Sequence, residues 1–201
     1  LDKDKKIYVL QNRKFTKARR VLVSVNGGVG SSNPYRNVSY VEPRLAIFLS
    51  EAFGIEGFYS KLMNSSNPTF EALQAKSVMP FVREINSETG VLLHWVPWYA
   101  KINVFNHVLY FDWGFEGGFA SLEATKNYKL STDLITDPVR SASDNQKAFL
   151  LGTTQQFFLN SNWSIRLDVL GAFYKATYKA ESADETWFSN FQYGLGLGFR
   201  L

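Results

Sequence analysis

Residues 108–120 read VLYFDWGFEGGFA, and the alternation within this stretch decides the fold. One set of alternate positions carries large apolar side chains, at Leu109, Phe111, Trp113, Phe115 and Phe119. The other set carries Tyr110, Asp112, Gly114, Glu116 and Gly118. A period of two is typical of a β-strand whose two faces meet different surroundings. Glycines and charges therefore share one face of this strand, and bulky aromatic residues take the other.

The same alternation recurs along the 201-residue chain and predicts eight strands. They are expected at residues 18–30, 38–50, 54–63, 92–104, 107–122, 148–159, 163–178 and 187–201. Short and long connections alternate, and the longest, 64–91, should hold a short helix with Asn67 as N-cap and Pro68 at the first helical position. Pro43 and Pro97 fall inside strands, and each predicts a bulge or a lost ladder bond.

The aromatic face is expected to point outward. The interior of an eight-stranded barrel barely holds its own side chains, so five large residues from one strand would not fit there. No apolar run approaches the ~20 residues of a membrane helix. We therefore expect an all-β fold: an eight-stranded antiparallel transmembrane β-barrel with short periplasmic turns and longer outer loops. The alternative is a soluble ligand-binding barrel, which alternates too.

The first twenty residues combine eight Lys or Arg with only Asp2 and Asp4, and they also contain apolar and aromatic residues. We predict a periplasmic N-terminal arm over residues 1–17, followed by the barrel over 18–201. The arm should pack under the barrel mouth or against a periplasmic protein. The residues predicted to bind a partner are Tyr8, Arg13, Lys14, Phe15, Arg19 and Arg20. The 64–91 loop is the rival binding site.

Charged residues on the predicted inward faces form a balanced set. Its members are Glu42, Arg44, Glu56, Lys101, Asp112, Glu116, Arg166, Asp168 and Arg200. Lone charges in so tight a space would be costly, so a paired network that fills the lumen is favoured over an ion path. Whether the lumen conducts small ions is left open.

No catalytic residue, metal site or cofactor is predicted. His94 and His107 are expected near opposite rims of the barrel, which argues against a shared metal or catalytic pair. Asp112 and Glu116 share a face but stand four strand residues apart, roughly 13 Å, which exceeds the spacing of a glycosidase carboxylate pair.

Three stretches together resemble the outer-membrane β-barrel domain family common in deltaproteobacteria. They are IYVLQNRKFTKARRVLVSVNGGVG (7–30), SEAFGIEGFYS (50–60) and PWYAKINVFNHVLYFDWGFEGG (97–118). The final strand, FQYGLGLGFRL (191–201), resembles the recognition signal of bacterial outer-membrane barrels, although it ends in Leu201 rather than an aromatic residue. The resemblance implies a small barrel in the bacterial outer membrane. Some members resemble components of gliding-motility or other envelope machines, and the family has no common enzymatic activity.

The expected function is therefore that of a structural or interaction subunit, anchoring an envelope protein assembly such as a motility-related one. The expected partners are outer-membrane lipid and other envelope proteins on the periplasmic side, without nucleic acid, and oligomerisation is left open. A small outer-membrane pore or a lipid-modifying barrel enzyme is the alternative.

Overall fold

The computed structural model describes residues 13–31, 33–78, 80–128, 140–177 and 185–201. It contains eight strands and one helix. The strands are β1 (Arg20–Ser31), β2 (Arg36–Phe48), β3 (Phe53–Ser66), β4 (Arg83–Val104), β5 (His107–Tyr128), β6 (Arg140–Phe158), β7 (Trp163–Thr177) and β8 (Glu185–Arg200). Helix α1 (Pro68–Ala75) lies between β3 and β4. Within the described ranges, no helix has the length and apolar composition to cross a bilayer.

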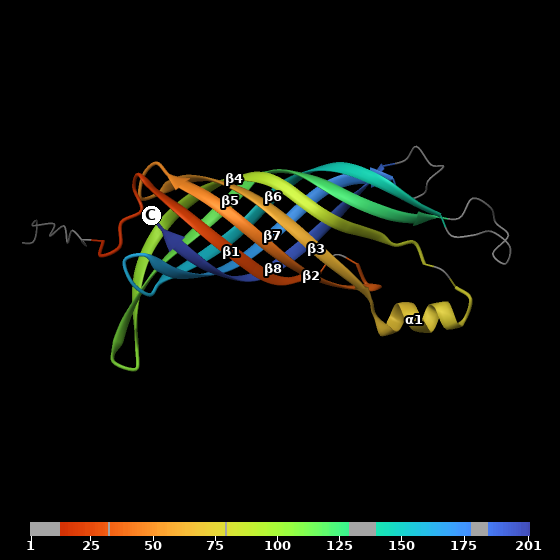
Figure 1. Cartoon of the computed structure of the whole chain (residues 1–201), viewed down its shortest axis with the longest axis horizontal. Helices are drawn as coiled ribbons and strands as arrows, with labels where there is room; N and C mark the ends of the chain where they lie inside the picture. The colour runs from red at the N-terminus through yellow and green to blue at the C-terminus, as the bar shows by residue number, and fades with distance from the viewer. Residues whose placement is uncertain (1–12, 32, 79, 129–139, 178–184) are drawn as a thin grey trace, which may run out of the picture.

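Each strand pairs antiparallel with its neighbour in sequence, and β1 pairs with β8 to close the barrel. The tight connections β2–β3, β4–β5 and β6–β7, the described start of the chain and the C-terminus share one end (Figure 1). We call this the tight-turn end, and the opposite end, which carries α1, the loop end. The closed antiparallel barrel confirms the predicted fold class.

The two faces of β5 show why the barrel has this orientation. Trp113, Phe115 and Phe119 point outward and are 40%, 38% and 72% exposed, whereas Asp112 and Glu116 point into the lumen at 2% each. Eight such strands leave an apolar outer wall around a narrow interior that holds the charged residues, which is the arrangement of a transmembrane barrel. The outward placement of the aromatic face is thus confirmed.

An inward glycine lets neighbouring strands approach where the lumen is narrow. A Cβ atom at Gly118 would overlap the backbone carbonyl of Val91 on β4, so no larger residue fits without a shift of the backbone. This explains why glycines share the face of the charged residues.

Three strands extend further toward the loop end than the alternation predicts. β4 begins at Arg83 rather than at residue 92, β5 continues to Tyr128, and β6 begins at Arg140. The barrel therefore continues beyond its apolar outer wall, into a part whose outer surface is polar. Alternation between apolar and polar residues is lost there because the outer face is polar while the inward face mixes apolar residues such as Ile85 and Ala124 with polar ones such as Ser87.

The local turn and cap features agree with the sequence. Asn67 accepts a hydrogen bond from the amide of Phe70 (2.9 Å) and caps α1, as predicted. The β4–β5 register shifts between Trp95 and Trp98, around Pro97, and the β2–β3 pairing skips Pro43 without a change of register.

Candidate functional site in the lumen

Six of the charged residues predicted to face the lumen meet in one cluster of ion pairs, which we call the ionic layer. They come from β2, β3, β5 and β7, and each is at most 3% exposed: Glu42, Arg44, Glu56, Glu116, Arg166 and Asp168. Because the barrel is closed, the inward-facing side chains of all its strands point toward a common centre. Residues more than a hundred positions apart in sequence are thus in direct contact.

Arg44 binds carboxylates from three strands. Its Nε lies 2.6 Å from Glu42 Oε1, and its Nη1 lies 2.9 Å from Glu56 Oε1 and 3.4 Å from Glu116 Oε2. Ionised hydrogen-bond partners of this kind make strong contacts. Arg44 therefore links β2, β3 and β5 across the lumen.

Arg166 completes the layer from β7. Its Nη1 lies 2.6 Å from Glu56 Oε2 and its Nη2 lies 3.1 Å from Asp168 Oδ1. Nη1 also donates to Ser24 Oγ at 3.3 Å, and Asn26 Nδ2 donates to Asp168 Oδ2 at 2.8 Å. Through these bonds the layer reaches β1, so five strands are tied together at this level.

His94 belongs to the ionic layer and was not placed there by the sequence. Its Nε2 lies 3.4 Å from Glu56 Oε1 and 3.7 Å from Glu116 Oε2, and the side chain is buried. The expectation that His94 sits near a rim is wrong, because β4 begins at Arg83 and residue 94 falls at its middle. His94 lies on the same inward face of the strand as Leu92 and Val96, and this alternation could have indicated from the sequence that it points into the lumen.

Glu56, His94 and Glu116 also form a group that could hold a metal, with ligand atoms within 4.8 Å of one another. However, the Nη1 atom of Arg44 already lies between the carboxylates of Glu56 and Glu116. A guanidinium so placed repels a divalent cation. The arrangement fits an ion-pair cluster better than a metal centre.

The ionic layer carries an excess of negative charge. Four carboxylates face two guanidinium groups, and the imidazole of His94 lies beside two of those carboxylates. Each arginine therefore serves more than one carboxylate.

The loop-end half of the lumen holds a packed group of apolar side chains, which we call the apolar layer, beside a buried polar pair in which Gln192 Nε2 donates to Glu88 Oε2 at 2.8 Å. Four leucines point inward from the consecutive strands β4 to β7, and each is at most 2% exposed: Leu92, Leu122, Leu150 and Leu170. Tyr40 and Phe58 pack against them from β2 and β3. A charge network alone was predicted to fill the lumen, so this packed interior was missed.

Residues 13–19, which we call the mouth segment, fold across the tight-turn end of the lumen. Phe15 is buried and stacks on Phe158, with ring centroids 5.3 Å apart, and it contacts the edge of Tyr110 at 5.6 Å. Lys17 is 2% exposed and forms an ion pair with Asp112. The described part of the predicted arm, residues 13–17, thus packs under the barrel mouth.

Glu51, in the β2–β3 turn, fastens the mouth segment to the barrel. Its carboxylate accepts hydrogen bonds from the amides of Lys17 (3.0 Å) and Ala18 (3.0 Å), and Arg13 Nη1 lies 3.2 Å away. Partial burial opposes ionisation, but these donors outweigh it and hold the pKa of Glu51 below its usual value. Burial lowers the pKa of Lys17, an effect that Asp112 counteracts.

Little space remains between the mouth segment and the ionic layer. A cavity of about 10 Å³, lined in part by Lys17, His94, Asp112 and Arg166, lies there. This is about the volume that one water molecule needs. Mouth segment, ionic layer and apolar layer thus follow one another along the lumen.

Three predicted network residues lie outside the ionic layer. Lys101 is exposed, because its inward-phase position lies on the part of the β4–β5 hairpin that projects beyond the barrel rim (Figure 1). Arg200 donates to the carbonyl oxygens of Thr16 (2.8 Å) and Ser161 (2.9 Å) instead of to a carboxylate. Asp112 is buried in the lumen but pairs with the mouth segment. Including Lys101 and Arg200 in one network was wrong.

The predicted partner-binding arm is divided by the structure. Arg13 and Phe15 are engaged in the barrel mouth, whereas Lys14, Arg19 and Arg20 have exposed side chains. The amide of Arg19 donates to the carbonyl of Phe48 at 2.7 Å, which leads the chain into β1. Tyr8 lies outside the described residues.

Solved structures similar to this chain are outer-membrane barrels. The N-terminal β-barrel domain of Pseudomonas aeruginosa OprF aligns with a TM-score of 0.54 at 11% identity, covering 92% of this chain and 98% of that one. Neisserial surface protein A gives 0.49 at 9% identity, with 90% and 95% covered. Ail of Yersinia pestis gives 0.44 at 10% identity, with 90% and 97% covered.

No protein-family model matches the sequence, and no curated protein does. The likeness to the OprF domain extends over nearly the whole of both chains, but at 11% identity it concerns the fold and not the activity. The chain therefore shares the fold of an eight-stranded outer-membrane β-barrel domain.

Proposed function

We propose that this barrel resides in the bacterial outer membrane as a structural or interaction subunit, which anchors a periplasmic protein at its tight-turn end. The observation that carries the proposal is the projecting tip of the β4–β5 hairpin, where Phe105 is 94% exposed. In barrels of this kind the tight turns face the periplasm. A soluble barrel does not fit, because the outer wall between the two ends is apolar.

The hairpin is built to present its tip. Phe105 and Asn106 both have positive φ angles, 47° and 64°, as required at the two central positions of a type I′ hairpin turn. Phenylalanine is a costly residue in that conformation, so its presence at the tip calls for a use outside the fold. Ile102, Val104 and Val108 next to it are 42%, 40% and 52% exposed.

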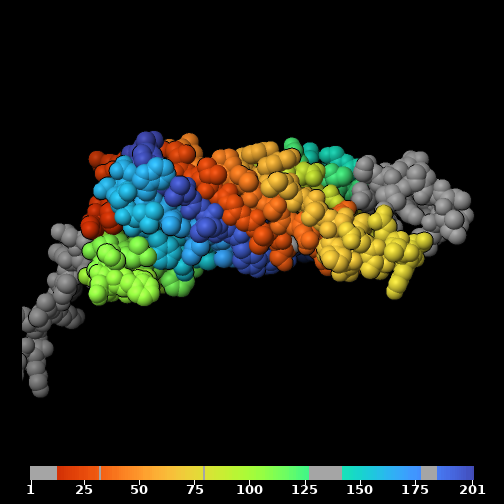
Figure 2. Space-filling view, turned by 60° about the horizontal axis from the view of Figure 1, so that its bottom comes forward, coloured from red at the N-terminus to blue at the C-terminus, as the bar shows by residue number. Residues whose placement is uncertain are grey.

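The surroundings of the tip specify the chemistry of the partner. Lys14, Arg19, Arg20 and Lys101 are exposed at this end, whereas Glu51 and Asp112 are held by the mouth segment. The partner should therefore offer an apolar pocket within an acidic surface. Figure 2 shows the hairpin, in light green, as a protrusion beside the end of the barrel, away from α1 in yellow.

The filled lumen supports a subunit that neither conducts nor catalyses. Ionic and apolar layers occupy the space that a pore would need, and both arginines of the ionic layer are paired with carboxylates. The finer expectations rest on the sequence resemblance: membership of the deltaproteobacterial family, and service in a motility-related or other envelope assembly. Association into an oligomer would be compatible with anchoring.

Co-purification from native membranes tests the anchoring role. The tagged protein should retain a periplasmic partner through mild detergent extraction, and Phe105→Ser should release that partner while the barrel still folds. Val78→Ser, which removes a half-exposed apolar side chain near α1 at the other end, is the matched control. Retention of the partner by the Phe105 variant, or equal loss from both variants, would overturn the proposal.

A further inference from the structure

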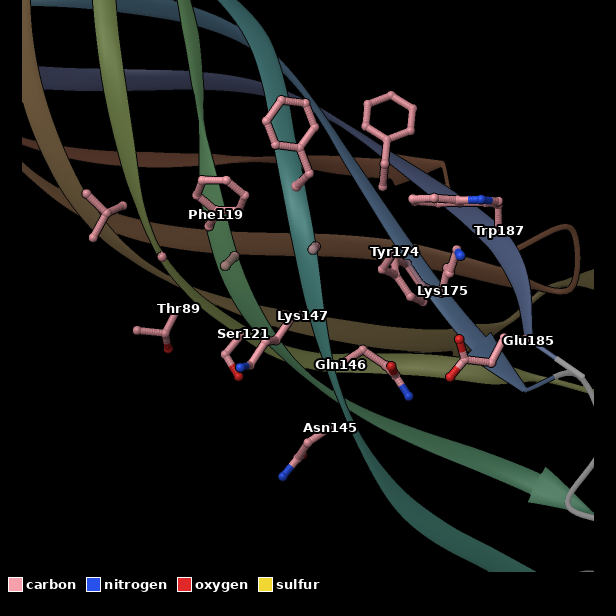
Figure 3. A pocket seen from close by; sticks show the side chains of 16 residues that line it. Thr89, Phe119, Ser121, Asn145, Gln146, Lys147, Tyr174, Lys175, Glu185 and Trp187 are labelled. Atoms are coloured by element: carbon pink, nitrogen blue, oxygen red, sulfur yellow. The ribbon is translucent and has the colours of Figure 1, made fainter. Parts of the chain in front are cut away.

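The outer wall near the loop end contains a groove whose rim and floor differ in chemistry. The groove has a volume of about 1090 Å³ and crosses β4 to β8, as Figure 3 shows from close by. It lies on the outward face, where the wall meets lipid. This site is separate from the lumen and from the hairpin tip.

The floor is a row of apolar side chains on four neighbouring strands. Val91, Phe119, Phe149 and Phe173 pair with one another in succession from β4 to β7. The rings of Phe119 and Phe149 lie 5.6 Å apart. Such a row suits contact with acyl chains.

The rim lies two residues nearer the loop end and is polar. Thr89, Ser121 and Lys147 pair with one another from β4 to β6, and Lys175 pairs with Trp187 from β7 to β8. This change from a phenylalanine row to a polar row marks the boundary between the hydrocarbon and the headgroups on this side of the barrel.

Lys147 and Lys175 stand at the rim on neighbouring strands, Lys147 beside Ser121 and Lys175 beside Trp187 (Figure 3), and among the described residues no carboxylate forms an ion pair with either. Ala148 pairs with Tyr174, so the next residues toward the loop end on these two strands are the two lysines. Both are exposed, and Lys175 Nζ lies 5.2 Å from the centre of the Trp187 ring. Glu185 lines the rim beside Thr177, yet within the described ranges no ion pair joins it to either lysine. Within those ranges, each lysine offers its positive charge to an anionic group at the rim.

We propose that this groove binds a phosphorylated membrane lipid, with its phosphate groups on Lys147 and Lys175 and its acyl chains on the phenylalanine row. Charge complementarity selects the phosphate, and the adjoining apolar row selects a lipid over a free anion. The indole of Trp187 holds Lys175 at the interface, where tryptophan is favoured.

A second groove on the outer wall serves as an internal comparison. It has a volume of about 700 Å³, and its exposed lining, which includes Val23, Leu45, Ile47 and Ile55, is apolar. Arg44, which also borders it, is buried in the ionic layer. This second groove offers no exposed cation to a headgroup. Of the two grooves, we therefore expect only the first to select a phosphorylated lipid.

Native mass spectrometry of the purified protein in neutral detergent tests the proposal. The probes are a bisphosphorylated acylated diglucosamine lipid, the same lipid without phosphates, and inorganic phosphate. Wild type should bind the phosphorylated lipid at least about tenfold more tightly than the dephosphorylated one, because each lysine near a lipid phosphate contributes favourably. The double variant Lys147→Gln/Lys175→Gln should lose that preference.

Lys61→Gln is the matched control, because Lys61 is an exposed lysine on β3, on another part of the wall. It should bind as wild type does. Equal binding of the two lipids by wild type, an unchanged preference in the double variant, or an equal loss in the Lys61 variant would overturn the proposal. Binding of inorganic phosphate as tightly as the lipid would show an anion site without lipid recognition, which also contradicts it.

Discussion

The tight-turn half and the loop-end half of the lumen are enclosed by the same eight strands but filled by different chemistry. In the first half, Arg44 and Arg166 bind a group of carboxylates. In the second half, Leu92, Leu122, Leu150 and Leu170 pack together. Buried ion pairs contribute little net stability compared with apolar packing, yet removing one partner is costly. The ionic layer therefore holds one arrangement of strands, while the apolar layer supplies favourable burial.

The largest effect is expected from Arg166→Ala. Glu56 and Asp168 would remain buried without their cation, which should lower the free energy of unfolding by about 3–5 kcal/mol. Urea unfolding of the barrel in lipid vesicles, followed by tryptophan fluorescence, measures the change. Arg20→Ala, at an exposed position, should stay within about 0.5 kcal/mol of wild type. Similar small losses in both variants would contradict the paired ionic layer.

A somewhat smaller effect is expected from Leu122→Ala in the apolar layer. Leu122 is fully buried, so the truncation should cost about 3 kcal/mol through lost burial and a residual cavity. Leu93→Ala is the control in the same assay: Leu93 points outward and is 61% exposed, and lipid can fill the space that it leaves. If the two variants were equally destabilised, the loop-end half of the lumen would not be a packed interior.

The smallest effect concerns pH and the mouth segment. The pKa of Glu51 is lowered in the folded state, so its contribution is fully present above the ordinary glutamate pKa of about 4.3 and is lost as pH falls through the lowered value. Acidification should then loosen residues 13–19, while the strands stay paired.

Hydrogen exchange of the Lys17 and Ala18 amides, which bind the Glu51 carboxylate, reports this loosening. After correction for intrinsic rates, protection should fall on acidification in wild type. It should already be reduced at neutral pH in Glu51→Gln. Protection that is independent of both pH and this substitution would show that Glu51 does not fasten the segment.

The sequence predicts the outer wall well because lipid imposes one requirement on every outward residue. In the stretch 108–120, glycines and carboxylates on one face and aromatics on the other were enough to orient β5. The apolar layer escaped prediction because it breaks this rule: Phe149 and Leu151 face lipid while Leu150 faces the lumen, so both faces of β6 are apolar there. Strand alternation carries no signal in such a segment.

Within the lumen, the sequence identifies inward charges but not their partners. Which carboxylate meets Arg44 depends on how far neighbouring strands are staggered around the barrel, and strand alternation does not encode this stagger. Lys101 shares the inward phase yet lies beyond the rim, and Lys17, outside every predicted strand, reaches Asp112. Both positions depend on the location of the barrel rim in the folded structure, which strand alternation does not indicate.

The ionic and apolar layers together close the lumen, and planar-bilayer recording measures this closure. The purified wild type should show no steady conductance, and neither should a variant lacking residues 1–15, because both layers remain when Phe15 and the preceding residues are removed. A large, steady conductance of the wild type would contradict closure of the lumen. Steady conductance of the truncated variant alone would show that the mouth segment, rather than the two layers, provides the seal.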